Sequence, residues 1–222
     1  MKQIIIITAG GSGKRMNTSI PKQFLLLNGE PVLMRTLRTF YQYNPEMAII
    51  LVLPSEQIKY WKTLCKKHRF NISHSIVEGG RTRHHSVKNA MNKVEPGTLV
   101  GIHDGVRPLV SRALIQACFD TAAVTGNAVP VTELTESIRK VNKEKSIRVD
   151  RSGFRMVQTP QVFQSDILID AFRQRYRSIF TDEATLVEEA GYAIYLVKGQ
   201  PENIKITTAL DLCIASTILD NC

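Results

Sequence analysis

A glycine-rich stretch near the N-terminus has residue types suited to holding a phosphate. "TAGGSGKRM" occupies residues 8–16 and directly follows the apolar run Ile4–Ile7. A glycine-rich turn after a buried strand presents backbone N–H groups to an anion. Arg15 and, seven residues further on, Lys22 add two cations beyond that turn. Such a combination suits a triphosphate, and its alternative is a solvated basic loop.

Two common phosphate-binding loops do not fit this stretch. A Walker A loop requires G-x-x-x-x-G-K-[ST], but Gly13-Lys14 is followed by Arg15, and Thr8 stands where the first glycine belongs. A dinucleotide-binding fingerprint requires a third glycine where the chain has Met16, and no acidic residue ends the second predicted strand. The interpretation that remains is the loop of a nucleotidyltransferase.

An acidic residue stands at the end of another apolar run. In "HDGVRP", Asp104 directly follows the predicted strand Leu99–His103. Mg²⁺ commonly takes one or two carboxylates together with phosphate oxygens, so Asp104 is a candidate magnesium ligand. The alternative is an aspartate that caps the turn. His103 should point to the opposite side of the strand from Asp104, so we expect it to pack or orient rather than abstract a proton.

The elements that must position these residues alternate along the chain. Short, β-branched apolar runs predict strands buried on both faces of a parallel sheet. The predicted strands are Gln3–Thr8, Met47–Leu53, Ile72–Val77, Leu99–His103, Asn127–Val131 and Ala193–Val197. The predicted helices run from Pro31 to Tyr43, from a Ser55 cap, over 85–93, from a Ser111 cap to Gly126, and over 165–177, 182–190 and 209–219. This alternation predicts a single α/β domain over residues 1–222, with a doubly wound, Rossmann-like, mostly parallel sheet.

The pattern changes after Val131. Apolar and polar residues alternate around the turn "NKEK", which predicts a hairpin of Ser137–Val141 with Ile147–Asp150 within an arm at about 135–153. A two-stranded arm is marginal in water by itself. We therefore expect a homodimer in which the arm embraces the other subunit.

Composition excludes several classes of protein. The chain has 222 residues, 43% hydrophobic and 22% charged, with a net charge of +9. The cations are scattered without interleaved aromatic residues, which argues against nucleic-acid binding. No run of 18 apolar residues and no signal peptide is evident, so we expect neither a membrane span nor export. Four cysteines without a C-x-x-C pair fit the reducing cytoplasm, with no zinc site.

Six motifs in order resemble the 2-C-methyl-D-erythritol 4-phosphate cytidylyltransferase family of the non-mevalonate isoprenoid pathway. The motifs are "AGGSGKRM…PKQF", "GGRTRHHSV", "HDGVRP", "VDRSG…QTPQVF", "TDEA" and "NIKITT". The resemblance implies a nucleotidyltransferase fold and transfer of a cytidylyl group from CTP to the polyol phosphate, with Mg²⁺ as cofactor. Ribitol-5-phosphate cytidylyltransferases are close relatives, although "VDR" and "TDEA" favour the methylerythritol branch. A non-catalytic nucleotide- or nucleic-acid-binding protein is a third alternative, which the set Arg15, Lys22 and Asp104 disfavours.

The resemblance also implies roles for matching residues. It assigns Arg15 and Lys22 to stabilising the transition state on the α-phosphate. It assigns Arg151 and Lys205, also counted as catalytic, to positioning the acceptor phosphate. It assigns Thr159 and Thr181 to the acceptor pocket and Asp104 to the metal. The implied CTP-binding residues are Ala9, Gly10, Gly11, Gly13, Gly79, Gly80, Ser86, Asp104 and Arg107. In the family the arm reaches the neighbouring subunit, so Arg151 would act either in its own subunit or across the dimer.

The chain departs from the family pattern at a few positions. The common "HDAARP" is here "HDGVRP", with Gly105 and Val106, which leaves Asp104 and Arg107 in place. Arg81 stands where some relatives have an acid, and Ser137 where some have a threonine. These last two differences concern details of base and polyol contacts.

Overall fold

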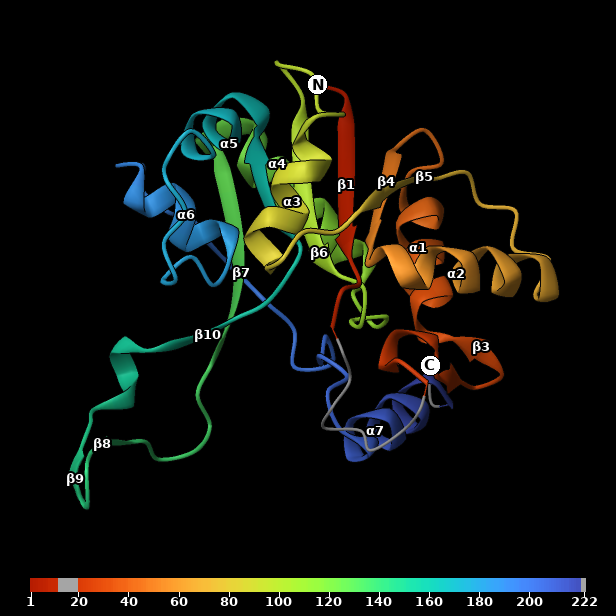
Figure 1. Ribbon diagram of the computed structural model, residues 1–222. Coiled ribbons are helices and arrows are strands. Elements are labelled where there is room, and N and C mark those ends of the chain that lie inside the picture. The colour runs from red at the N-terminus through yellow and green to blue at the C-terminus, as the bar shows by residue number, and fades with distance from the viewer. Residues whose placement is uncertain (12–19, 221–222) are drawn as a thin grey trace.

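One mixed sheet organises the molecule (Figure 1). The computed structural model describes residues 1–11 and 20–220. In this part of the chain eight strands form a sheet in the order β10-β7-β11-β6-β1-β4-β5, with β12 paired to β7. These strands are β1 (Gln3–Thr8), β4 (Ala48–Leu53), β5 (Ser75–Glu78), β6 (Leu99–Asp104), β7 (Asn127–Glu133), β10 (Arg155–Val157), β11 (Gln161–Gln164) and β12 (Leu196–Lys198).

The centre of the sheet is parallel, as the apolar runs predict. β1 pairs in parallel with both β4 and β6, and β4 pairs in parallel with β5. Their carboxyl ends therefore lie at one edge, with Thr8 beside Asp104 and Leu53 beside Glu78. β11 is not among the predicted strands; it lies between β6 and β7 and is antiparallel to both. The mostly parallel, Rossmann-like fold is confirmed.

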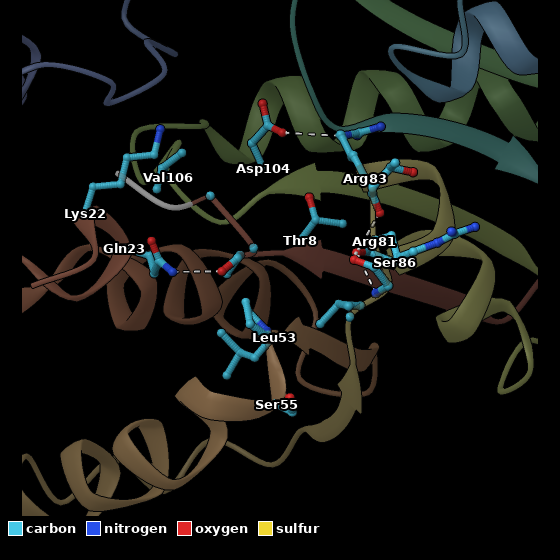
Figure 2. A pocket seen from close by; sticks show the side chains of 18 of the residues that line it. Thr8, Lys22, Gln23, Leu53, Ser55, Arg81, Arg83, Ser86, Asp104 and Val106 are labelled. Carbon is cyan, nitrogen blue, oxygen red and sulfur yellow. Dashed lines mark hydrogen bonds and ion pairs between the residues drawn. The ribbon is translucent and has the colours of Figure 1, made fainter. Parts of the chain in front are cut away.

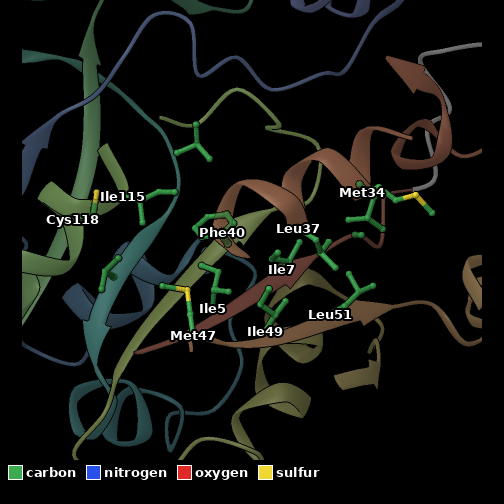
Figure 3. Packing of buried hydrophobic residues seen from close by; sticks show 14 of the residues in the cluster. Ile5, Ile7, Met34, Leu37, Phe40, Met47, Ile49, Leu51, Ile115 and Cys118 are labelled. Carbon is green, nitrogen blue, oxygen red and sulfur yellow. The ribbon is translucent and has the colours of Figure 1, made fainter. Parts of the chain in front are cut away.

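Helices cover both faces of the sheet because β1 alternates its side chains between two cores. Ile5 and Ile7 pack with α1, α2 and α4, as Figure 3 shows for part of this cluster. Ile4 and Ile6 pack on the other face with α3, α5 and α6. Burying apolar side chains on both faces supplies the main stabilisation of such a layered domain. The helices are α1 (Val32–Tyr43), α2 (Ser55–Lys67), α3 (Arg83–Met91), α4 (Arg112–Thr125), α5 (Ser165–Ala171), α6 (Glu183–Glu189) and α7 (Ala209–Asp220).

Helix boundaries confirm some predicted caps and correct others. Ser111 accepts a hydrogen bond from Leu114 N, and Gly126 ends α4 with a φ of 93°. Ser55 is not a cap: Pro54 takes that position without a side-chain hydrogen bond, and Ser55 is the first residue of α2. Pro31 likewise precedes α1 rather than opening it. The predicted helix 165–177 ends at Ala171, since the chain then turns to bury Phe172 and Phe180 in one cluster.

A small subdomain covers one end of the sheet near α7. The short strands β2 (Leu26–Leu27) and β3 (Glu30–Pro31) pair with each other. Leu27, Val106 and Ile206 form a third apolar cluster with Ala215 of α7. Ile206 N donates to Val106 O at 2.9 Å, which ties the C-terminal segment to the loop after β6.

A hairpin extends away from the sheet (Figure 1). β8 (Arg139–Asn142) pairs antiparallel with β9 (Lys145–Arg148), and every residue of both strands is exposed. The hairpin is shifted from its predicted limits because Lys143, at a φ of 53°, and Glu144 form a two-residue turn. A 3-10 turn, η3 (Arg151–Gly153), follows it. No helix within the described ranges 1–11 and 20–220 is long and apolar enough to span a membrane.

Candidate active site

A cavity of about 610 Å³ lies at the carboxyl ends of the parallel strands. Open α/β sheets bind ligands at this edge. Its walls come from the ends of β1, β4 and β6 and from the segments that follow them (Figure 2). Lys205 also lines the cavity. The predicted site residues on the cavity are Ala9, Gly10, Gly11, Lys22, Gly79, Gly80, Ser86, Asp104 and Lys205. Sequence segments nearly 200 residues apart therefore meet in one cavity.

Asp104 is the charged centre of the cavity. Its Oδ2 lies 3.0 Å from Lys205 Nζ and 3.1 Å from Arg107 Nε. Its Oδ1 lies 3.8 Å from Arg83 Nε, and Figure 2 shows these two side chains pointing toward one another. Burial alone would raise the pKa of Asp104, but the cations of Lys205, Arg83 and Arg107 hold it well below its usual range. Asp104 is therefore an anion throughout the physiological pH range.

Lys22 reaches the cavity from a 3-10 turn, η2 (Lys22–Phe24). The neighbouring Gln23 is fully buried and donates to Ala9 O at 2.9 Å and to Gln57 Oε1 at 2.6 Å. These bonds fix η2 against β1 and α2. A Cβ on Gly11 would lie 3.3 Å from Lys22 Cε, so a glycine there lets the lysine stem pass close to the backbone.

The segment between β5 and α3 forms the opposite wall. Ser86 Oγ accepts from Gly80 N at 3.1 Å and donates to Thr82 O at 3.0 Å. Thr82 caps α3 by accepting from His85 N. A Cβ on Gly80 would lie 2.4 Å from the Cβ of His85, so this tight path requires glycine. These bonds hold the backbone of residues 79–86 in one shape.

A hydrogen-bond network beneath Asp104 orients its loop. Thr159 Oγ1 accepts from Asp104 N at 3.1 Å and lies 3.0 Å from His103 Nδ1. His103 Nε2 lies 3.1 Å from Arg107 O, which can only accept. Nε2 therefore carries a proton, and in the neutral ring Nδ1 accepts from the Thr159 hydroxyl. Burial lowers the pKa of His103 to about 4, in agreement with its neutral form.

Two charged residues that are not among the predicted site residues form an ion pair at the edge of the cavity: Arg83 lines the wall, and Glu183 lies buried behind it. The Arg83 guanidinium lies 2.7 Å from the carboxylate of Glu183, which is 2% exposed. Burial alone would lower the pKa of Arg83, but the carboxylates of Glu183 and Asp104 outweigh it and raise that pKa. Glu183 is the first residue of α6 and does not cap it, because Asp182 accepts the capping bond from Thr185 N.

Other predicted site residues lie away from the cavity wall. Arg107 is held behind Asp104, with its NH1 2.7 Å from Asn203 O. Thr159 is buried beneath Asp104, and Thr181 is exposed outside the cavity lining. Arg151 is exposed in the arm and donates to Thr135 O. Gly13 and Arg15 lie outside the described residues.

Arg81 and Ser137, the two departures from the family pattern that concern ligand contacts, lie in different places. Arg81 is exposed and lies on the cavity wall. Ser137 is exposed near the base of the arm, outside that wall. Arg81 is therefore the one of the two that lies on the cavity.

Comparison with known proteins gives one consistent result. A family profile described as 2-C-methyl-D-erythritol 4-phosphate cytidylyltransferase matches residues 3–221. A protein of that name from Bacteroides fragilis is 48% identical over 219 residues, covering 99% of this chain and 100% of the relative. One from Porphyromonas gingivalis is also 48% identical, with 98% of each chain covered.

Solved structures agree with the sequence comparison. The crystal structure of 2-C-methyl-D-erythritol 4-phosphate cytidylyltransferase from Thermus thermophilus superposes with a TM-score of 0.80 at 30% identity, covering 99% of this chain and 100% of that one. The enzyme of that name from Francisella tularensis gives a TM-score of 0.82 at 28% identity, covering 98% and 99%. Both likenesses extend over the whole described fold.

Proposed function

The chain belongs to the 2-C-methyl-D-erythritol 4-phosphate cytidylyltransferase family, and we propose that the cavity around Asp104 is where its reaction takes place. The protein transfers the cytidylyl group from CTP to 2-C-methyl-D-erythritol 4-phosphate in isoprenoid synthesis. The observation that supports this placement is the convergence of Lys22, Lys205 and the anionic Asp104 on one cavity beside the Gly10–Gly11 turn.

The reaction needs positive charge more than it needs a base. A phosphate oxygen of the acceptor attacks the α-phosphorus of CTP, the bond between the α-phosphorus and the bridging oxygen breaks, and pyrophosphate leaves. The second pKa of a phosphomonoester is about 6, so the nucleophile is mostly dianionic at pH 7. His103 has both ring nitrogens engaged and is fully buried, so it does not serve as a base.

Lys22 and Lys205 would supply the stabilising charge. Phosphoryl transfer is catalysed mainly by positioning and by cations placed where negative charge develops. Lys22 approaches from the β1 side, and Lys205 approaches from the C-terminal segment next to Asp104. Arg15 is proposed from the family motif to act with Lys22 on the α-phosphate.

Asp104 fits a magnesium ligand. Its carboxylate is ionised and lines the cavity. The described residues contain no cluster of three or more metal-ligating side chains, so most ligands would be nucleotide oxygens and water, as is usual for Mg²⁺. Asp104 would hold the ion together with CTP phosphate oxygens. When bound, the ion would neutralise part of the charge that the acceptor phosphate must approach.

The Gly79–Gly80 segment is proposed to hold the cytosine. Its backbone is fixed by Ser86 and by the start of α3, so its N–H and C=O groups keep a constant pattern. Such a pattern can distinguish the N4 amine of cytosine from the O4 of uracil. Turnover of UTP as efficient as that of CTP would contradict this assignment.

The arm is proposed to form a homodimer. Val141 and Ile147 of the hairpin are 69% and 62% exposed, and Phe154 and Met156 beyond it are each 49% exposed. A second subunit would bury these side chains, and its acceptor site, proposed to include Thr181, would receive Arg151. Thr159 would serve that site indirectly, through the Asp104 loop that it orients. Deleting residues 138–150 should give a monomer in analytical ultracentrifugation, and an unchanged dimer would contradict the proposal.

The cytoplasm is proposed as the compartment. Cys65, Cys118 and Cys213 are free thiols in the described part of the chain, which suits a reducing environment. Fractionation of cells that express the native chain would test this placement.

A paired-acceptor assay tests the function as a whole. Pyrophosphate release is measured with CTP and either 2-C-methyl-D-erythritol 4-phosphate or ribitol 5-phosphate. The first acceptor should be turned over far more efficiently. Lys22→Ala should lose about a hundredfold or more in kcat, whereas Lys62→Ala, on the exposed side of α2, should not. Equal rates with both acceptors would contradict the substrate assignment.

A further inference from the structure

Arg83 lies between two carboxylates and contacts them unequally. Its guanidinium is 2.7 Å from Glu183, but its Nε is 3.8 Å from Oδ1 of Asp104. A separation of 3.8 Å is too long for a hydrogen bond. Glu183 therefore takes the close contact, and Asp104 receives the charge of Arg83 only at a distance.

Glu183 is held firmly in this place. It opens α6, and the residue before it is fixed twice: Asp182 accepts from Thr185 N at 2.9 Å and from Gln161 Nε2 at 2.9 Å. Gln161 also accepts from Ala184 N at 3.0 Å. Glu183 itself is 2% exposed, so its charge needs the close partner that Arg83 provides.

The two oxygens of Asp104 consequently differ. Oδ2 already has Lys205 at 3.0 Å and Arg107 at 3.1 Å. Among the described residues, Oδ1 has only the long contact with Arg83. Without the charge of Glu183, Arg83 would gain by moving onto Oδ1, because a charge-assisted bond is much stronger than a contact at 3.8 Å. Both oxygens of Asp104 would then be occupied by protein cations.

We propose that Glu183 is a positioning residue for the reaction: it holds Arg83 away from Asp104 and keeps Oδ1 open to the divalent cation that binds with the nucleotide. This inference rests on the proposed role of Asp104. A buried glutamate outside the cavity wall would thus control the affinity of the site for a divalent ion.

Glu183→Gln tests the inference because it keeps the shape and removes the charge. Mutation of a residue that orients a metal ligand typically lowers the affinity for the metal by roughly 10- to 100-fold. We expect that loss in the affinity for Mn²⁺, measured by electron paramagnetic resonance with saturating CTP and no acceptor. A crystal structure of the variant should show Arg83 hydrogen-bonded to Asp104. Glu188→Gln, with the same charge change at an exposed position of α6, should leave Mn²⁺ affinity unchanged.

A double variant guards against a folding defect. Removing one partner of a buried ion pair can destabilise a protein strongly, so Arg83→Gln is combined with Glu183→Gln, which leaves two amides that can bond to each other. With no guanidinium to move onto Asp104, the double variant should bind Mn²⁺ within about threefold of the wild type. An affinity as poor as that of folded Glu183→Gln would overturn the inference, as would wild-type affinity in Glu183→Gln.

Asp104→Asn separates this inference from the proposed site. If it leaves Mn²⁺ binding unchanged, the assignment of Asp104 as metal ligand is wrong, and the inference is overturned with it. If it abolishes Mn²⁺ binding while Glu183→Gln does not weaken it, the site stands and only the role of Glu183 is wrong.

Discussion

Lys205 Nζ lies 3.0 Å from Oδ2 of Asp104, although the two residues are 101 positions apart in the chain. The backbone bond from Ile206 N to Val106 O brings their segments together. The Lys205 side chain is 42% exposed and that of Asp104 is 9% exposed, so the lysine can reach a ligand while the aspartate stays fixed. The pair therefore combines a partly exposed cation, Lys205, with a buried anion, Asp104, on the same cavity.

Lys205→Met should reduce kcat/KM for cytidylyl transfer by about a hundredfold, the usual cost of removing one charge-stabilising group from an active site. The apolar stem remains and Asp104 keeps Arg107 and Arg83 beside it, so the variant should fold with a thermal midpoint lowered only modestly by the lost ion pair. Steady-state pyrophosphate release with CTP and the methylerythritol acceptor measures the effect. Lys198→Met, at an exposed position of β12, is the matched control and should keep full activity. Equal losses in the two variants would show that net charge, rather than the position of Lys205, matters.

The sequence predicts the elements that bury apolar runs and misses those that depend on pairing. β1 has its predicted limits because Ile4–Ile7 are β-branched and fully buried, with both neighbouring strands parallel. β11 is short and carries a glutamine at each end, so its sequence has no strand-like apolar run. Its place between β6 and β7 depends on pairing with segments far away in sequence, which no local pattern encodes.

The same distinction holds for the candidate site. Lys22, Asp104 and Lys205 belong to local motifs, and the structure brings all three to one cavity. Arg83 and Glu183 are 100 positions apart, and nothing near either residue in the sequence indicates a buried ion pair. The glutamate follows Thr181-Asp182 at a helix start, where a capping role is the ordinary expectation.

Gly105→Ala should destabilise the protein. A Cβ there would lie 2.9 Å from Leu33 Cδ1, 3.1 Å from Ala9 Cβ and 3.1 Å from Thr8 O. Overpacking of this kind typically costs about 1–3 kcal/mol. Urea unfolding should show that loss, and Leu33→Val in the same chain should recover part of it. An unchanged free energy of unfolding in Gly105→Ala would contradict this prediction and would mean that β1 can shift to admit the Cβ without losing stability.

Trp61 reports on the protonation of His74. Trp61 Nε1 donates to His74 Nε2 at 3.0 Å, while His74 Nδ1 lies 2.7 Å from Ile72 O. Burial lowers the pKa of His74, so the ring stays neutral until the pH falls below the ordinary value of about 6.5. Protonation then removes the acceptor from the only tryptophan of the chain. Trp61 fluorescence should therefore titrate below pH 6.5 and stay flat in His74→Gln, and a flat wild-type curve would contradict the pairing.

His103 should make the protein less stable in mild acid. Burial lowers its pKa to about 4 in the folded chain, against about 6.5 when unfolded, so the unfolded chain binds the extra proton between these values. Stability is therefore complete above pH 6.5 and falls as the pH decreases toward 4, by about 2 kcal/mol at pH 5. Urea unfolding at pH 7.5 and pH 5 measures this loss. His103→Asn cannot titrate, so its loss over the same interval should be smaller by about that amount. An equal loss in both proteins would assign the acid sensitivity to other groups and would mean that the hydrogen bonds of His103 to Thr159 and Arg107 do not hold the ring neutral.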